Sequence, residues 1–255
     1  MRQFLVFSLC LFTMTICAQT VKEMEPILGY FVDKSPEGEI AFIKQREKCE
    51  TVWRKVRSQR DFENLSTEDK KIYTNCSDDK DDYWDVLGVG CSWYCGGGLD
   101  TASASSDLKP FKGIKYAAKY SHDLNYKTAW IEGVAGYGIG EYLLYSFPPE
   151  NPRITKVIIV NGYVKSEKVW RENSRVKKLK MYIDDKAFAI LNLADTRQEQ
   201  IFSFDPIGNG DRKNWEKLKS KPGWTMKLEI MDVYPGEKYD ETAITEIYFD
   251  GIDVH

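Results

Sequence analysis

The later part of the chain alternates apolar and polar residues in the way that half-buried β-strands do. The segment 177–183, "KKLKMYI", places Leu179, Met181 and Ile183 on one face and polar or aromatic residues on the other. The segment 225–233, "TMKLEIMDV", repeats the same two-residue period. Both segments are therefore predicted to be strands with one face toward a core.

Further strand-like segments are separated by short turns that contain Gly, Pro, Asn or Asp. They read "GEYLLYSF", "KVIIV", "AFAILNL", "EQIFSFD" and "ITEIYFDGI", at residues 140–147, 156–160, 187–193, 199–205 and 244–252. The pattern contains no β–helix–β alternation and no internal repeat. Short strands at close spacing predict a mainly β fold, a β-sandwich or jelly roll. Residues 101–255 are numerous enough to form one core.

Residues 39–80 instead carry apolar residues near a period of 3.6 among many charges, which predicts helices. Ser66 is followed three residues later by Asp69, a pattern typical of a capped helix start. We therefore predict a small helical region over residues 19–100, ahead of the β domain.

The N-terminus has the layout of a secretory signal peptide. Arg2 precedes an apolar run from Phe4 to Ile16, and the small residue Ala18 follows. This run is shorter than the roughly 20 residues that cross a bilayer. We expect cleavage after Ala18, which leaves Gln19 as the first residue of an exported protein, whether periplasmic, cell-surface or secreted.

The charge balance argues against nucleic acid as a partner. The sequence holds 36 Lys and Arg and 39 Asp and Glu, a net charge of −3 that becomes −4 when Arg2 leaves with the signal peptide. Nucleic-acid binding requires a positive face. The acidic run "SDDKDD" at 77–82 is predicted to be a solvated loop rather than a metal site. No later stretch is apolar enough for a membrane helix, and the oligomeric state is left open.

Four cysteines follow the signal peptide: Cys49, Cys76, Cys91 and Cys95. An even number in an exported chain predicts disulfides. Three pairings are open, and we favour Cys49–Cys76 with Cys91–Cys95 because each closes a short local loop. A zinc site is the alternative, weakened by the unusual C-x3-C spacing and by the presence of only two histidines.

The segment 128–141, "TAWIEGVAGYGIGE", is rich in glycine. A dinucleotide-binding loop needs its glycines between a strand and a helix. Here the glycines lead into "YLLYSF" and Pro148-Pro149, which predicts a strand, and no P-loop lysine is present. The glycines are therefore predicted to form turns at the rim of a sandwich.

Four stretches occur in order along the β region. They are "SASSDL" at 103–108, "YAAKYSHDLNYKTAWIEGVAGYGIGE" at 116–141, "VNGYVKSEKVWRENSRVKKL" at 160–179 and "DVYPGEKYDETAITEIYFDG" at 232–251. Together they resemble the discoidin-like (coagulation factor V/VIII type C) β-sandwich, and more closely the glycan-binding module of streptococcal NAD glycohydrolase-type proteins. The resemblance covers about residues 101–253 and leaves no room for the enzymatic part of the glycohydrolase. It implies a jelly-roll sandwich that binds carbohydrate through loops at one end.

Residues in these loops have the chemistry of a sugar site, in which aromatic rings stack on CH faces and planar polar groups bind hydroxyls. The predicted ligand-binding residues, of which the last two are rim positions, are Trp130, Glu132, Asn161, Tyr163, Asn173, Arg175, Tyr234 and Tyr239. The rigid guanidinium fork of Arg175 would also suit a carboxylated sugar. Core packing is the alternative for each aromatic residue.

The segment "DLNYKT" at 123–128 offers three oxygen-bearing side chains in a short loop, as hard cations prefer: Asp123, Asn125 and Thr128. In discoidin-like modules such a loop often holds a structural Ca2+, helped by a glutamate near the C-terminus, and Glu246 resembles that glutamate. An Asx-turn without a metal is the alternative.

Catalysis is not expected. Nucleophilic triads generally need a histidine, and the candidates are His122, in the predicted calcium loop, and His255, the last residue. Carboxylates are present, but no spacing singles out a pair for glycoside hydrolysis. We predict a non-catalytic carbohydrate-binding module. A protein-binding adhesion module is the alternative, and a glycoside hydrolase is a weaker one. A concave groove with aromatic and polar residues favours a sugar, and a flat apolar patch favours a protein.

Overall fold

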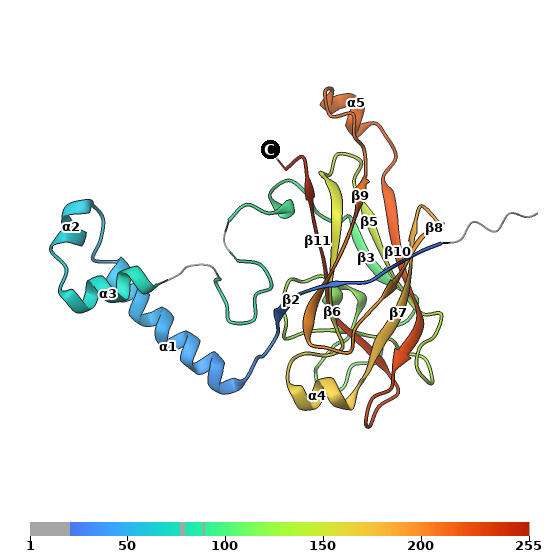
Figure 1. Ribbon diagram of the computed structural model, residues 1–255, viewed down its shortest axis with the longest axis horizontal. Coiled ribbons are helices and arrows are strands. Elements are labelled where there is room, and N and C mark those ends of the chain that lie inside the picture. The colour runs from blue at the N-terminus through green and yellow to red at the C-terminus, as the bar shows by residue number, and fades with distance from the viewer. Residues whose placement is uncertain (1–20, 77–79, 89, 255) are drawn as a thin grey trace, which may run out of the picture.

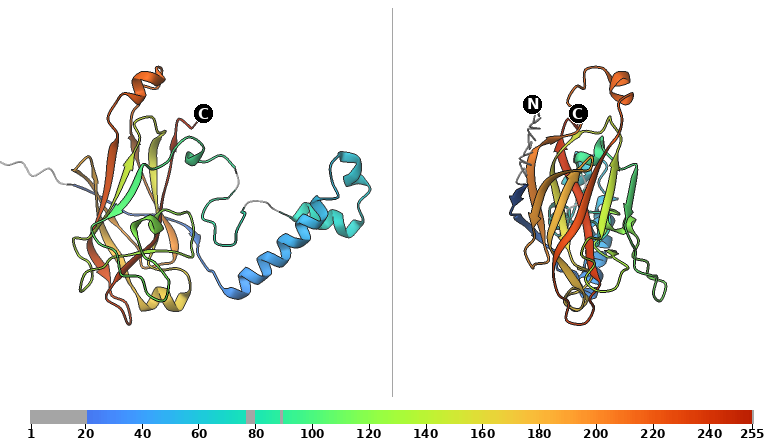
Figure 2. Two further views of the ribbon diagram at one scale, coloured as in Figure 1. Left: turned by 180° about the vertical axis from the view of Figure 1, so that it is seen from behind. Right: turned by 90° about the vertical axis from the view of Figure 1, so that its right-hand side faces the viewer.

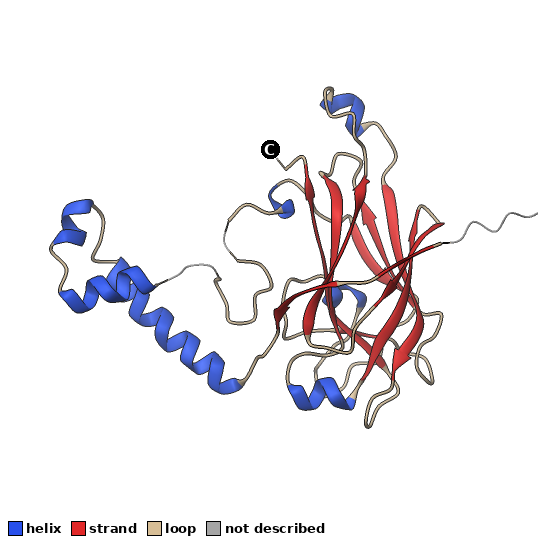
Figure 3. Cartoon of the chain, in the orientation of Figure 1, coloured by secondary structure: helices blue, strands red, loops and turns tan. Residues whose placement is uncertain are grey.

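The computed structural model describes residues 21–76, 80–88 and 90–254. The predicted signal peptide, residues 1–18, lies outside these residues. Most of the described chain forms a β-sandwich, and a helical arm projects from one side of it (Figures 1 and 3). Within the described part of the chain, no helix is both long enough and apolar enough to cross a membrane.

Eleven strands of the described chain build the sandwich. They are β1 Lys22–Met24, β2 Ile27–Phe31, β3 Thr101–Ala104, β4 Trp130–Ile131, β5 Tyr142–Phe147, β6 Arg153–Asn161, β7 Ser174–Ile183, β8 Lys186–Asn192, β9 Gln198–Ile207, β10 Trp224–Tyr234 and β11 Thr242–Ile252. The main path runs β2-β9-β6-β11-β7-β10-β5-β3. Three strands lie off this path: β8 pairs with β7, β1 pairs with β8, and β4 pairs with β11. A short parallel contact, Thr242 opposite Ser174, joins β11 to β7 and links the two layers visible in Figure 2.

The two-residue period of the sequence decides which side chains fill the core. Leu179 and Met181 of β7 are fully buried, as predicted, and Ile183 is partly buried against the same core. Strand β10 likewise buries alternate residues from Trp224 to Ile230. The predicted mainly β sandwich is therefore confirmed.

Two strands of the N-terminal region were not predicted from the sequence. Strand β2 pairs with β9, and β1 pairs with β8. Trp84 and Val86 are also buried, in a cluster with Tyr126 of the sandwich. Both ends of the segment 19–100 thus contact the sandwich, and the predicted helices occupy its middle.

The arm contains three helices: α1 Pro36–Trp53, α2 Gln59–Glu63 and α3 Thr67–Asn75. Each begins after a serine whose hydroxyl accepts a backbone N–H of the first turn. At α3 the Ser66 hydroxyl accepts the N–H of Asp69 at 3.0 Å, as predicted. These caps satisfy N–H groups that a helix start leaves without a partner.

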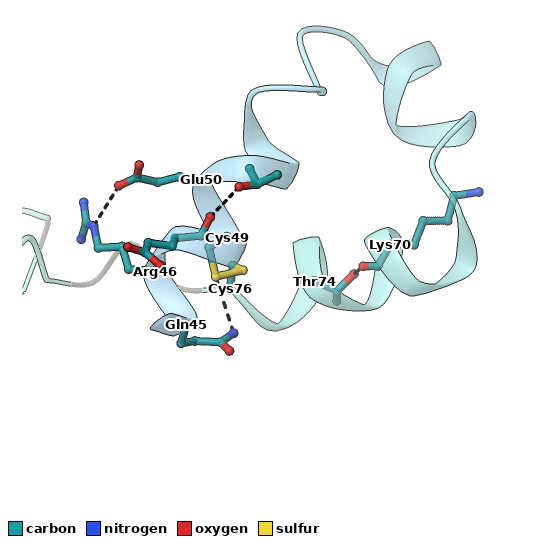
Figure 4. Close-up of a disulfide and its surroundings, with 9 residues drawn as sticks. Gln45, Arg46, Cys49, Glu50, Lys70, Thr74 and Cys76 are labelled. Atoms are coloured by element: carbon teal, nitrogen blue, oxygen red, sulfur yellow. Dashed lines mark hydrogen bonds and ion pairs between the residues drawn. A yellow bond between two sulfur atoms is a disulfide. The ribbon is translucent and has the colours of Figure 1, made fainter. Parts of the chain in front are cut away.

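Cys49 of α1 and Cys76, which directly follows α3, form a disulfide (Figure 4). This confirms the first predicted pair. The second predicted pair is not joined by a disulfide in this structure: the sulfur atoms of Cys91 and Cys95 are 3.6 Å apart, a hydrogen-bond contact, and a disulfide requires about 2.0 Å. Cys95 is the last residue of the short 3-10 helix η1, Trp93–Cys95, and Cys91 lies just before this helix. The second bridge therefore stays a prediction.

Cys49→Ser should loosen the arm and leave the sandwich intact, because the bridge joins only helices of the arm. A disulfide of this kind contributes about 2–4 kcal/mol. Limited proteolysis should cut the variant within residues 36–75 roughly tenfold faster than the wild type, and the main melting transition should not move. Reduced wild-type protein should behave like the variant. A large fall in the main transition would show instead that the arm supports the sandwich.

Candidate binding site at the loop end of the sandwich

Loops gather at the end of the sandwich that carries α4, Glu167–Glu172, opposite the end that carries α5, Trp215–Lys219 (Figure 1). We call this the loop end. Its segments are 105–117, 122–129, 132–141, 162–173 and 235–241. The predicted ligand residues lie in or beside these segments because β4 and β6 end here and β7 and β11 begin here. Burial and hydrogen bonding separate these residues into different roles.

Trp130 and Glu132 hold the end of β4 in place. The Trp130 side chain is buried, and its Nε1 donates to the Ser106 carbonyl at 3.0 Å. Both carboxylate oxygens of the buried Glu132 accept backbone N–H groups, from Thr242 at 3.0 Å and from Val134 at 2.9 Å. Burial raises the pKa of Glu132, and these two hydrogen bonds oppose that rise. Neither side chain presents a ring face or a free oxygen to a ligand.

Asn161 and Arg175 join neighbouring segments of the sandwich. The fully buried Asn161 amide donates to the Val176 carbonyl at 2.7 Å and accepts the Val176 N–H at 2.9 Å. The Arg175 guanidinium binds both carboxylate oxygens of Asp195, at 3.0 and 2.8 Å, and donates to the Asn173 carbonyl at 3.1 Å. With its fork occupied, Arg175 could bind a sugar carboxylate only by giving up Asp195. The geometry favours a structural role for both residues.

Three of the other predicted residues range from buried Asn173, through half-buried Tyr234, to exposed Tyr239. The Asn173 side chain donates to the Val169 carbonyl at 2.8 Å and closes α4. The Tyr234 hydroxyl donates to the Leu193 carbonyl at 3.0 Å, and the residue is half-buried. Tyr239 is 41% exposed and remains available at the rim.

The eighth predicted residue, Tyr163, borders a concave site that the sequence did not reveal. This pocket has a volume of about 330 Å3 and is lined by Gly113, Ile114, Lys115, Tyr120, Lys127, Thr128, Tyr163 and Lys165. We call it the lysine–tyrosine pocket. The Tyr163 hydroxyl donates to the Lys127 carbonyl at 3.2 Å, and burial raises its pKa to about 12. Tyr163 is therefore a neutral phenol at physiological pH, and the pocket has the size of a small-ligand site.

A local signal in the sequence could have pointed to this pocket. The segment 109–128 holds five lysines and only one carboxylate, Asp123. The negative net charge of the whole chain conceals this basic stretch. The fold then adds Lys165, from the loop after β6, to the lysines of that segment.

The predicted metal residues come together around Glu246 of β11. Its carboxylate is fully buried, and its Oε2 accepts the Asn125 N–H at 3.2 Å. Its Oε1 has no hydrogen-bond partner among the described residues. Burial, and then the nearby carboxylate of Asp123, raise the pKa of Glu246 well above its ordinary value. A cation near these two carboxylates would satisfy the unpaired oxygen, so the donor set fits a hard cation.

The other two predicted metal ligands are engaged within their own loop. Thr128 Oγ1 donates to both carboxylate oxygens of Asp123 at 2.8 Å. Asn125 Oδ1 accepts the Lys127 N–H at 2.9 Å, which is an Asx-turn contact. Across the described ranges, no group of three or more His, Cys, Asp or Glu side chains could hold a metal ion. The fit to a cation therefore rests on Asp123 and Glu246.

The two-layered sandwich with its loops gathered at one end defines a discoidin-like module. The sequence model described as "NAD glycohydrolase translocation F5/8 type C domain" matches residues 93–250, more than half of the chain, and the chain belongs to this family. The resemblance predicted from the sequence is thereby confirmed. None of the curated proteins compared matches the sequence.

Several solved structures have a similar fold. CpGH89CBM32-5 from Clostridium perfringens, in complex with GalNAc-beta-1,3-galactose, shows 14% identity and a TM-score of 0.41 over 59% of this chain and 94% of that chain. The CBM32-1 and CBM32-2 domains of Clostridium perfringens ZmpB, in complex with GalNAc, show 9% identity and a TM-score of 0.42 over 60% and 33%. The arabinofuranosyltransferase AftD from Mycobacteria shows 14% identity and a TM-score of 0.41 over 68% and 12%. These scores are too low to transfer a ligand or a site residue to this chain.

Asn161→Ala should destabilise the sandwich rather than remove a ligand contact. The change leaves the N–H and carbonyl of Val176 buried without partners, at about 1–3 kcal/mol for each group. Calorimetry should show a melting temperature lower by roughly 5 °C or more. Tyr239→Ala, at the exposed rim, is the matched control and should melt within about 2 °C of the wild type. An Asn161→Ala protein that melts like the wild type would contradict this structural role.

Proposed function

We propose that this chain is an exported, non-catalytic carbohydrate-binding module that binds a glycan or glycoconjugate in the lysine–tyrosine pocket. Membership of the F5/8 type C family supports a binding role, and the layout of residues 1–18 as a signal peptide supports export. The observation that carries the proposal is the pocket itself. It is concave, lies among the loops, and is lined by two tyrosines and three lysines.

The lining of the pocket suits a sugar ring. Tyr120, which is partly exposed, and Tyr163, which is largely buried, offer aromatic surface for the CH groups of a sugar. Lys115 and Lys165 offer N–H donors for its oxygens. A shallow site of this kind desolvates little of a hydrophilic ligand, so single contacts are weak. We therefore expect useful retention only when several copies of the module bind one polysaccharide.

A specific observation favours a protein partner as the second candidate. The loop 132–141 exposes Val134, Tyr137 and Ile139, which are 40%, 39% and 57% exposed. These side chains form part of the rim of the loop end and would suit an apolar surface of another protein. Catalysis is disfavoured because a candidate carboxylate, that of Glu132, already binds two backbone N–H groups.

We further propose a structural Ca2+ held by Asp123 and Glu246, with Asn125 and Thr128 as additional oxygen donors after a rearrangement of their loop. The ion would neutralise a buried carboxylate and fix the loop 122–129 against β11. The buried Oε1 of Glu246 supports this proposal, because it has no hydrogen-bond partner within the described residues and His122 Nδ1, 4.0 Å away, is engaged with the Ile247 carbonyl. In the alternative no metal is bound, and the hydrogen bonds from Thr128 to Asp123 close the loop instead.

Tyr120→Ala should abolish retention of the mature chain on a multivalent glycan array, because it removes the ring on which a sugar would stack. The melting temperature should stay within about 3 °C, since the ring is partly exposed. Trp215→Ala is the matched control, because it removes an aromatic side chain, 47% exposed, at the opposite end of the sandwich. If wild-type protein binds no glycan and captures a protein partner through the loop 132–141, the adhesion alternative replaces the proposal.

Removal of calcium should lower the melting temperature, and added Ca2+ should restore it. An ion at 100 times its dissociation constant stabilises by about 2.7 kcal/mol. Glu246→Gln should remove this sensitivity to chelator. Glu132→Gln, which changes a buried carboxylate with both oxygens engaged, should weaken the fold and keep the sensitivity. Wild-type melting that responds neither to chelator nor to calcium would establish the Asx-turn alternative.

A further inference from the structure

We propose that the lysine–tyrosine pocket selects glycans that carry anionic groups, either carboxylate or sulfate. This inference rests on the proposed function, since it concerns the ligand class of the same pocket. The charged side chains that line the pocket are Lys115, Lys127 and Lys165. No Asp or Glu is among the lining residues.

The balance of donors and acceptors points to an anion. An ammonium group has three donors and no acceptor, whereas a sugar hydroxyl both donates and accepts. A site for neutral sugars therefore benefits from carboxylate or amide oxygens beside its donors. The lysine–tyrosine pocket is lined by three lysines, two of which form no ion pair with a described residue, and its Thr128 hydroxyl already donates to Asp123. Acceptor-only groups such as carboxylate or sulfate complement this lining best.

The ammonium groups of two of these lysines are available for a ligand. Lys115 and Lys165 form no ion pair with any residue that the structure describes. The Lys127 ammonium instead lies 3.8 Å from a carboxylate oxygen of Glu39 and 5.4 Å from the centroid of the Trp84 ring, and neither residue lines the pocket. The anion preference therefore rests on Lys115 and Lys165.

The basic segment holds a single carboxylate, that of Asp123. Both of its oxygens accept the Thr128 hydroxyl, and it interacts electrostatically with the buried Glu246. A Ca2+ ion at Asp123 and Glu246 would neutralise both carboxylates. The mature chain has a net charge of −4, so a polyanion needs a locally basic surface to bind, and the segment 109–128, with five lysines and one carboxylate, provides one.

The experiment uses the mature full-length chain displayed in many copies on a biosensor surface. Four polysaccharides form two matched pairs: polygalacturonate against its methyl ester, and dextran sulfate against dextran. Each pair keeps the sugar backbone and changes its charge. We expect at least one anionic member to bind roughly tenfold or more tightly than its neutral counterpart, with binding that weakens as salt is raised.

Variants test whether this preference belongs to the pocket. Lys115→Ala with Lys165→Ala should reduce binding to the anionic polysaccharide roughly tenfold or more, and the corresponding double change to Arg should keep most of it. Lys213→Ala with Lys217→Ala removes the same charge at the α5 end and should leave binding unchanged. Equal losses for the two Ala pairs would overturn the assignment to the pocket.

The remaining outcomes separate this inference from the proposed function. Equal binding to charged and neutral members of both pairs would overturn the anion preference and leave glycan binding standing. The absence of binding to any of the four and to a wider glycan array would overturn both. Binding to phosphatidylserine vesicles without binding to either polyanion would also overturn the inference, in favour of a membrane surface.

Discussion

Every buried backbone N–H and carbonyl at the loop end must find a hydrogen-bond partner, and this requirement organises both the fold and the site. Asn161 supplies such partners to Val176, and Glu132 supplies them to Thr242 and Val134. These contacts fix where β6 ends and where β11 begins. The side chains that make them are no longer available to a ligand. Binding chemistry is therefore left to residues of the outer loops, above all the segment 109–128.

Much of the fold could be predicted because burial in a two-faced strand leaves a direct trace in the sequence. The alternation around Leu179 and Met181 requires only that one face meets a core. The pairing of Cys49 with Cys76 is local and follows from short loop closure. Strands β1 and β2 could not be predicted in this way, because they are short and lie beside a helical arm. Their partners, β8 and β9, are far away in the sequence.

The site was harder to predict than the fold for a related reason. Asn, Arg and Glu at the ends of strands have the same appearance in a sequence whether they bind a sugar or a backbone group. Arg175 illustrates this, because its partner Asp195 lies in a different loop and meets it only in the folded chain. Tyr163 was predicted, but its neighbours Lys115 and Lys165 come from separate segments that the fold brings together. The excess of lysine in the segment 109–128 is visible in the sequence, whereas the pocket exists only in the folded chain.

The most direct test of the account is a map of where a glycan contacts the chain. Isotope-labelled mature protein can be titrated with an oligosaccharide of galacturonate while its amide resonances are followed. The account predicts shifts concentrated in residues 113–128 and 163–165, with little change at the α5 end. Shifts centred on residues 208–223, or no shifts with any charged or neutral oligosaccharide, would contradict the claim that the lysine–tyrosine pocket binds glycan.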